Sequence, residues 1–262
     1  MKPTLARAVP LHETAEFFDK RTRYCLVVPV INEGERIAIQ LRAMRAANIP
    51  DLLDVVIADG GSTDGSLHAD LLRETGVRTL LTKTGPGKLS AQLRMGYAYA
   101  LDQGYDGVVT IDGNGKDSVK TIPLFAQALD EGIDYAQASR FIPGGQAINT
   151  PHIRTLGIKL VHAPVLSIAA RRRFTDTTQG FRAYSARYLT HPQVQPFRDI
   201  FETYELLAYL TVRASQLGLR TREIPSTRTY PADGSIPTKL NARGNIDLIK
   251  ILVATLTGRY NP

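Results

Sequence analysis

The sequence has 262 residues, of which 43% are hydrophobic and 22% are charged, and its formal net charge is +7. This composition excludes collagen-like, disordered and disulfide-scaffold proteins, and the length suits one large domain or two small ones. Cys25 is the only cysteine, so an internal disulfide and a cysteine-based zinc cluster are both excluded. Since Cys25 falls in a predicted buried strand, we expect an unreactive core thiol.

Membrane-spanning and nucleic-acid-binding proteins are also disfavoured. No run approaches the roughly 18 consecutive apolar residues of a transmembrane helix, and the amino terminus has no apolar core of signal-peptide length. We therefore expect a cytoplasmic protein. The positive charge suits nucleic acid, an anionic membrane surface or a phosphate-rich substrate. Apart from 171–173 the basic residues are scattered, and no nucleic-acid-binding motif is present, so we do not expect nucleic acid as a partner.

The first 120 residues predict strands alternating with helices. Residues 1–21 predict an irregular or helical lead-in. Compact β-branched runs then predict strands, and apolar residues spaced three or four apart predict helices. The predicted strands are 24–31, 54–61, 77–83 and 107–115, and the helices between them are 32–47, 62–75 (capped by Ser62 or Thr63) and 90–104. This order predicts a largely parallel sheet with right-handed crossovers.

The remaining residues continue the pattern less regularly, without an internal repeat or a low-complexity linker. The chain is therefore expected to form a single domain. The predicted elements are a helix at 123–132, a strand at 135–141, a polar loop around 143–145, an apolar segment with basic ends at 154–173, a turn and short strand at 176–185, a helix at 201–218, a strand at 219–231 and a helix at 244–258.

Carboxylates follow three of the predicted strands. The strands end in the segments VINEGER, IADGGSTDGS and TIDGNGKD, each with at least one acidic residue. A strand end needs turn residues, so any single aspartate among Asp59, Asp64, Asp112 and Asp117 is explained by the turn alone. Open parallel sheets bind ligands at the carboxyl ends of their strands. The repetition therefore predicts a binding site at this edge of the sheet.

The motifs PVINEGERI, IADGGSTDGS and TIDGNGKD, in this order, resemble the amino-terminal half of family 2 glycosyltransferases. The segments ASRFIPGG, DTTQGFRAYS, TREIP and RTYPADGSIPTK resemble later motifs of the dolichyl- or polyprenyl-phosphate sugar synthase branch, so that the resemblance covers about 24–245. It implies an α/β fold of the GT-A type, a Rossmann-like, mostly parallel mixed sheet flanked by helices. Residues 22–120 would bind the nucleotide sugar and 121–262 the acceptor.

The resemblance also implies roles for the residues at the first two strand ends. Pro29, Asn32 and Glu33 would frame the nucleotide, with Glu33 accepting hydrogen bonds from ribose or base. Asp59 would bind the base, and Ser62, with Asp64, would support that turn.

A third set of donor contacts is expected at the glycine-rich loop 84–88. Lys88 opens a helix there, and a helix amino end with a lysine suits phosphate. The loop lacks P-loop spacing. Arg94, one turn into the helix, is expected to border the site.

The strand end at Asp112 is the expected metal site. In the family this position reads Asp-x-Asp and holds Mg²⁺ or Mn²⁺ against the donor diphosphate, and hard divalent ions prefer such oxygen ligands. Here Asn114 replaces the second aspartate, so one negative charge is missing. Asp117 would restore that charge directly or through a water molecule. The predicted metal ligands are therefore Asp112, Asn114 and Asp117.

Cations in the second half are expected to neutralise the departing nucleoside diphosphate and an anionic acceptor, a large catalytic effect in a preorganised site. These cations are Arg140, Arg182, Arg228 and Lys239.

A catalytic base is required only for a hydroxyl acceptor, because an acceptor phosphate is already ionised. The available carboxylates are Asp176, which with Gln179 matches the acceptor-side motif, and Glu202 and Glu205 on one predicted helix. The predicted catalytic residues are Asp112, Arg140, Asp176 and Glu202.

Three functions remain open beside the leading one. The leading function is inverting transfer of a sugar from a nucleotide donor to a lipid-linked phosphate or lipid-linked sugar. The alternatives are a soluble or polysaccharide hydroxyl acceptor, a sugar-1-phosphate nucleotidyltransferase, and an inactive nucleotide-binding domain. The apolar-basic segment 154–174 suits either a buried helix or one lying on the inner face of a membrane. A homo-oligomer is compatible with the sequence, and the five histidines are expected in loops or at the surface.

Overall fold

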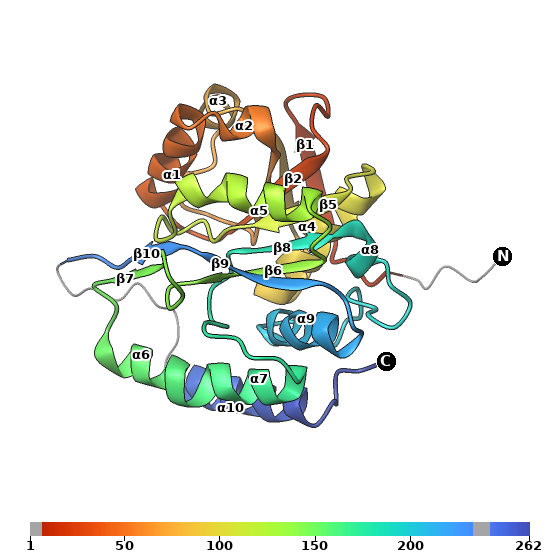
Figure 1. Cartoon of the computed structure of the whole chain (residues 1–262). Helices are drawn as coiled ribbons and strands as arrows, with labels where there is room; N and C mark the ends of the chain where they lie inside the picture. Colours follow the sequence, from red (N-terminus) through yellow and green to blue (C-terminus); the bar gives the residue numbers. More distant parts are fainter. Residues whose placement is uncertain (1–6, 233–241) are drawn as a thin grey trace.

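An eight-stranded mixed sheet forms the centre of the molecule, in a computed structural model that describes residues 7–232 and 242–262 (Figure 1). The strand order is β1-β4-β3-β2-β5-β8-β6-β9, and a second sheet pairs β10 with β7. The strands are β1 (His12–Glu16), β2 (Tyr24–Val30), β3 (Asp54–Asp59), β4 (Val77–Lys83), β5 (Gly107–Thr110), β6 (Tyr135–Ser139), β7 (Gln146–Ile148), β8 (Arg182–Ser185), β9 (Thr221–Pro225) and β10 (Thr227–Thr229).

Helices cover both faces of the large sheet. They are α1 (Glu35–Ala46), α2 (Ile49–Leu52), α3 (Ala69–Glu74), α4 (Leu89–Asp102), η1 (Val119–Thr121), α5 (Ile122–Asp130), α6 (His152–Gly157), η2 (Ile158–His162), α7 (Ala163–Ala170), α8 (Ala186–Leu189), α9 (Glu205–Gln216) and α10 (Ala242–Leu256). Together they give the predicted α/β architecture of a mostly parallel sheet flanked by helices.

Alternating side chains of the central strands build two separate cores. On β2, Cys25 and Val27 pack with α4 and α9, whereas Leu26, Val28 and Val30 pack with α1 and α5. A strand buried on both faces is apolar throughout, which explains the continuous hydrophobic runs in the sequence. Burial raises the pKa of the Cys25 thiol, in agreement with the inert core cysteine expected there.

The parallel strands β2, β3 and β5 align their carboxyl ends at one edge of the sheet. Val30 at the end of β2 lies opposite Asp59 at the end of β3. Beyond β5 the direction changes, because β8 is antiparallel to both β5 and β6. Parallel sheets place ligands at this kind of edge.

Two amino-terminal expectations were wrong. The lead-in contains β1, which pairs antiparallel with β4. The helix expected from Ser62 begins only at Ala69, where the His68 ring accepts the Leu71 N–H as its cap. Ser62 and Thr63 instead lie in the loop before it, because Asp59 and Asn32 accept their backbone N–H groups.

In the second half, a helix start, a long strand and a polar loop differ from the expectation. The helix predicted from residue 201 starts at Glu205, and the final predicted strand divides at Ser226 into β9 and β10. The division occurs because the Ser226 N–H donates to Ser139 of β6, whereas its carbonyl accepts from Gln146 of β7. The expected polar loop after β6 therefore contains a short strand.

The apolar segment after β7 forms one continuous helical run through α6, η2 and α7. By length and composition alone this run, His152–Ala170, is the one candidate for a membrane-spanning helix among the described residues, and 28% of it is buried. Its inner side packs on α9 and α10, and α7 and α10 lie side by side below α9 in Figure 1. The run therefore lies along the molecule rather than projecting from it.

Candidate active site

Two loops at the carboxyl edge of β2 and β3 are locked together by reciprocal hydrogen bonds. The Asn32 N–H donates to the Ser62 hydroxyl at 2.9 Å, and the Thr63 N–H donates to the Asn32 side chain at 2.8 Å. The Gly34 N–H donates to Asp64 at 2.9 Å. Asn32, with φ 47°, adopts the left-handed conformation that asparagine tolerates. The predicted donor loops thus form one rigid rim.

Asp59 lies at this rim beside Val30, where the sequence predicted a carboxylate facing Pro29 and Glu33. Its oxygens accept the Ser62 N–H at 3.0 Å and the Ser62 hydroxyl at 2.6 Å. Glu33 forms an ion pair with Arg36 at 2.8 Å. Pro29 is buried within β2, and its carbonyl accepts the Gly113 N–H at 3.2 Å, which ties the β5 loop to β2.

Gln92 on α4 joins the ends of β2 and β3 through its side-chain amide, a role that the sequence analysis missed. Its amide donates to the carbonyls of Val30 at 2.8 Å and Ala58 at 3.0 Å. A Cβ on Gly60 would approach this amide to 2.8 Å. A glutamine four residues after the glycine-rich loop 84–88 is the sequence signal that points to it.

Asp112 and Asp117 share one arginine. Arg228 Nη2 donates to Asp112 at 3.2 Å, and Nη1 donates to Asp117. Residues 116–118 pair with 227–229 through backbone bonds, which fixes this geometry. The Asp112 side chain is 22% exposed, whereas that of Asp117 is fully buried. Burial lowers the pKa of a guanidinium, but the two carboxylates outweigh it and raise the pKa of Arg228.

Two more cations surround Asp112. The Lys116 ammonium lies 5.1 Å and the Arg154 guanidinium 5.7 Å from the centre of the buried Tyr230 ring, over which Arg228 also lies. Burial, with the charge of Arg228, lowers the pKa of Lys116 to about 8. Neither Lys116 nor Arg154 was predicted, because the family pattern drew attention to the carboxylates.

The residues predicted to hold a divalent ion do not converge. Asn114 turns its amide oxygen to the Lys116 N–H at 3.2 Å, and Asp117 is buried against Arg228. No group of three or more His, Cys, Asp or Glu side chains able to hold a metal occurs in the part of the chain that the structure describes. A Cβ on Gly180 would lie 2.0 Å from Asp112 Oδ1, so the backbone there closely borders this carboxylate. Asp112 is the one predicted ligand with an exposed carboxylate.

Arg140 and Asp176 form a second, closed ion pair. Arg140 Nε donates to Oδ2 at 2.6 Å and Nη2 to Oδ1 at 3.0 Å. Gln179 and Thr178 donate to the same carboxylate, and Glu223 accepts the Asp176 N–H at 3.1 Å. Burial raises the pKa of Asp176, but the hydrogen bonds and charge of Arg140 outweigh it and lower the pKa. In this geometry Asp176 is the buried ion-pair partner of Arg140, whereas the buried Arg140 Nη1 has no hydrogen-bond partner.

Arg182 is a core residue and not a donor contact. Its guanidinium donates to the carbonyls of Gln179, Leu207 and Thr177 and to the Thr211 hydroxyl. These bonds use all three nitrogens of a side chain that is almost completely buried. The expected role in diphosphate neutralisation is therefore corrected.

His162 also faces inward, contrary to the surface or loop position expected of the histidines. Its ring bonds the Thr177 hydroxyl at 2.6 Å. Burial, with the charge of Arg182, lowers its pKa to about 4.

Glu202 and Glu205 do not share a helix face. Glu202 is exposed in the loop before α9, and Glu205 caps that loop by accepting the N–H groups of Glu202 at 3.0 Å and Thr203. The exposed Lys88 lies close by, since its N–H donates to the Glu202 carbonyl at 2.9 Å. Arg94 donates to the Ala8 carbonyl and so anchors the amino-terminal segment.

Lys239, predicted as a phosphate contact, lies outside the described residues. Among the described residues, the carboxyl edge combines the interlocked rim with the partly exposed carboxylate of Asp112 and the cations Lys116, Arg154 and Arg228.

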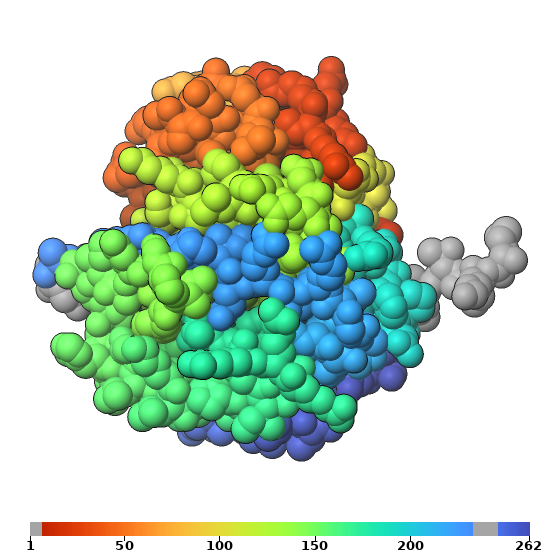
Figure 2. All heavy atoms as spheres, in the orientation of Figure 1, coloured from red at the N-terminus to blue at the C-terminus, as the bar shows by residue number. Residues whose placement is uncertain are grey.

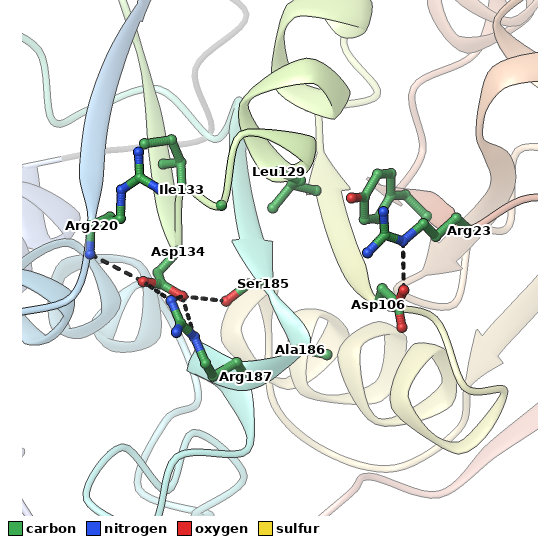
Figure 3. Close-up of a pocket in the computed structure, with 11 residues that line it drawn as sticks. Arg23, Asp106, Leu129, Ile133, Asp134, Ser185, Ala186, Arg187 and Arg220 are labelled. Carbon is green, nitrogen blue, oxygen red and sulfur yellow. Dashed lines mark hydrogen bonds and ion pairs between the residues drawn. The ribbon is translucent and has the colours of Figure 1, made fainter.

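A hollow lies at the opposite, amino-terminal edge of the sheet (Figure 3), with a volume of about 520 Å³. Its charged groups satisfy one another. Arg23 pairs with Asp106 at 2.6 Å, and Asp134 accepts from Ser185, Arg187 and the Arg220 N–H. The hollow therefore has the character of a structural junction.

Comparison with known proteins finds relatives by sequence and by fold. No protein-family profile matches the chain. An undecaprenyl-phosphate mannosyltransferase of Micrococcus luteus is 28% identical over 208 residues, which cover 78% of this chain and 83% of that protein. A polyprenol monophosphomannose synthase of Mycolicibacterium smegmatis is 27% identical over 213 residues, 79% of this chain and 77% of that protein.

The fold resembles solved structures of glucosyl-3-phosphoglycerate synthase from Mycobacterium tuberculosis. A complex with Mn²⁺, uridine diphosphate and glucosyl-3-phosphoglycerate has a TM-score of 0.58 and 20% identity, over 90% of this chain and 79% of that one. A complex with phosphoglyceric acid has a TM-score of 0.62 and 19% identity, over 89% and 80%. The shared fold and the two sequence relatives confirm the resemblance to family 2 glycosyltransferases that was drawn from the motifs.

Proposed function

We propose that this glycosyltransferase moves a sugar, with inversion, from a nucleoside diphosphate donor to the phosphate of a polyprenyl-type lipid. The donor would lie on the rim formed by Asn32, Asp59 and Ser62, with its diphosphate near Asp112. Two relatives named for polyprenyl-phosphate or polyprenol substrates support the acceptor.

The observation that carries the acceptor class is the state of the carboxylates proposed as bases. Asp176 accepts from Arg140, and Glu205 accepts from the loop before α9. Glu202 is exposed in the loop before α9. A hydroxyl acceptor needs a base within hydrogen-bond reach, but an ionised phosphate does not. The arrangement therefore favours an anionic acceptor.

In the proposed reaction, an acceptor phosphate oxygen attacks the anomeric carbon of the donor sugar. The new bond forms between that oxygen and the anomeric carbon, while the bond from this carbon to the diphosphate oxygen breaks. The electron pair leaves with the nucleoside diphosphate. Arg228 and Arg154 would stabilise the charge that develops on the leaving group, a contribution that grows in a water-poor site.

A divalent ion is proposed from the neighbouring structures, whose complexes contain Mn²⁺ or Mg²⁺ with uridine diphosphate. Asp112 would be its carboxylate ligand, and the ion would supply further positive charge to the diphosphate. Asn114 and Asp117 are turned to Lys116 and Arg228, so the donor set fits a divalent ion only in part. No chemical step is assigned to the ion.

The helical run α6–η2–α7 and the helix α10 are proposed to rest on the membrane that carries the lipid acceptor. In Figure 2 the green atoms of α6 and α7 and the dark blue atoms of α10 cover the lower surface. Exposed large hydrophobic residues of these helices are Ile153, Leu156, Leu160, Val161, Ile168, Ile246, Ile249, Val253 and Leu256. An apolar face with basic residues at 171–173 suits the boundary of an anionic bilayer.

Sugar transfer to two matched lipids tests the proposed reaction. The protein would be incubated with labelled UDP-glucose or GDP-mannose and either undecaprenyl phosphate or undecaprenol in detergent. We expect labelled lipid only with the phosphate. Equal labelling of undecaprenol would contradict the phosphate acceptor, and labelling of neither lipid with either donor would count against the lipid-directed reaction.

Vesicle binding tests the membrane face separately. Leu160→Glu with Ile168→Glu should abolish co-sedimentation with anionic vesicles, whereas Ile39→Glu on the exposed side of α1 should not. Binding of the wild type should weaken at high salt, because screening reduces surface attraction. Equal binding of both variants would exclude this face.

A further inference from the structure

The segment after β5 departs from the Asp-x-Asp pattern by two charges. Asp112 is followed by Asn114, which removes one negative charge, and by Lys116, which adds one positive charge. An Asp-x-Asp pair with a bound divalent ion has a net charge of zero. Asp112, Asn114 and Lys116 together reach the same net charge with no ion.

The structure brings the ammonium of Lys116 into the same cluster as Asp112. Lys116 is buried, its backbone N–H donates to the Asn114 amide oxygen at 3.2 Å, and its ammonium lies 5.1 Å from the Tyr230 ring centre. Backbone pairing of Lys116 with Thr229 at 2.8 Å fixes the segment against β10. The charges of Asp112, Arg228 and Arg154 all act on Lys116.

We infer that Lys116 binds the donor diphosphate and supplies positive charge that a divalent ion supplies in an Asp-x-Asp site. This inference rests on the proposed nucleotide-sugar donor. It predicts that nucleoside diphosphate binding persists when divalent ions are removed. A charge-assisted hydrogen bond to phosphate contributes about 1.5–3 kcal/mol, so its loss should weaken binding by about ten- to a hundredfold.

Calorimetric titration with UDP and with GDP, in chelator and in Mn²⁺, tests the inference without a turnover assay. For the nucleotide that binds, the wild type should show less than about a tenfold difference in Kd between the two conditions. Lys116→Met should lose about ten- to a hundredfold in chelator and recover part of this in Mn²⁺. Lys120→Met, at an exposed lysine on η1, is the matched control and should bind as the wild type does.

A double variant sharpens the test by rebuilding the two-carboxylate pattern. Asn114→Asp with Lys116→Met should make binding strictly dependent on Mn²⁺. A wild type that binds only with Mn²⁺, together with a Lys116→Met protein whose Kd equals that of the wild type, would overturn the role of Lys116. Failure of both nucleotides to bind in either condition would instead count against the proposed donor.

Discussion

Two arginine–carboxylate groups lie at the same edge of the sheet. They differ in the exposure of the carboxylate and in the number of protein donors bound to it. Around Arg228, the Asp112 carboxylate is 22% exposed and accepts one arginine bond. Around Arg140, the Asp176 carboxylate has no exposed side-chain surface and accepts from several donors. The first group retains capacity for a ligand, whereas the second is built as a structural pair.

This difference teaches that residue type alone does not identify a catalytic group. A buried carboxylate whose oxygens are saturated cannot take up a proton near neutral pH, since hydrogen bonds to the charged form lower its pKa. An accessible carboxylate among cations can exchange its partners when an anion binds. The comparison predicts that changes at Asp112 affect activity, whereas changes at Arg140 or Asp176 affect folding.

The largest expected effect is at Asp112. Asp112→Ala should reduce turnover by about a thousandfold, which corresponds to about 4 kcal/mol of transition-state stabilisation. The protein should remain folded, because Asp112 is partly exposed and its loss creates no core cavity. Turnover and thermal unfolding would be measured together, with Asp106→Ala at the opposite edge as the control. Near-normal turnover of Asp112→Ala would remove it from the mechanism.

Breaking the closed pair should act on stability. Arg140→Met leaves Asp176 buried without its cation, and such a loss typically costs about 3–5 kcal/mol of unfolding free energy. At about 2–4 °C per kcal/mol for a chain of this size, Tm should fall by about 6–20 °C. A variant with unchanged Tm but abolished turnover would show that Arg140 acts on substrate and not on the fold. Arg140 Nη1 has no hydrogen-bond partner and could contact substrate, so turnover would be measured as well. The assay temperature would lie below the lowered Tm, so that the variant is folded.

A smaller effect is expected at Gly180, which follows Asp176 closely in the sequence and borders Asp112 in space. Gly180→Ala places a Cβ 2.0 Å from Asp112 Oδ1, so the carboxylate must move. Displacement of a reacting group by about 1 Å can cost about a hundredfold in rate. We expect that loss in turnover with little change in Tm, because the end of a flexible side chain yields. Wild-type turnover in this variant would show that the position of Asp112 is unimportant.

The smallest effect concerns pH. The folded pKa of Asp176 is lowered, so its ion pair adds stability that is fully present above the unfolded value of about 3.9. This contribution is lost as pH falls through the folded pKa. Below about pH 4, the free energy of unfolding in urea should therefore fall more steeply with decreasing pH for the wild type than for Arg140→Met. Parallel pH profiles of the two proteins would contradict this assignment.

The sequence predicted the fold well because hydrophobic periodicity is local. The buried runs at β2, β3 and β4 and the turns after them identified the parallel sheet and the edge where its loops meet. The start of α3 was misplaced because Asn32, far away in sequence, holds the loop containing Thr63. Such long-range polar bonds leave no periodic signal.

The site was predicted less completely, for a related reason. The sequence named Arg182 as a phosphate contact, but its bonds to Leu207 and Thr211 exist only once Arg182 lies against α9. Lys116 and Arg154 were missed because a cation near a carboxylate in space need not be near a motif in sequence.

A crystal structure of the protein with the nucleoside diphosphate that binds it tests the central claim most directly. We predict that the diphosphate lies at the carboxyl edge of β2, β3 and β5, within hydrogen-bond distance of Lys116 or Arg228, with the base beside Asp59. A nucleotide in the hollow lined by Arg187 and Arg220 at the opposite edge, with none beside Asp112, would contradict the account.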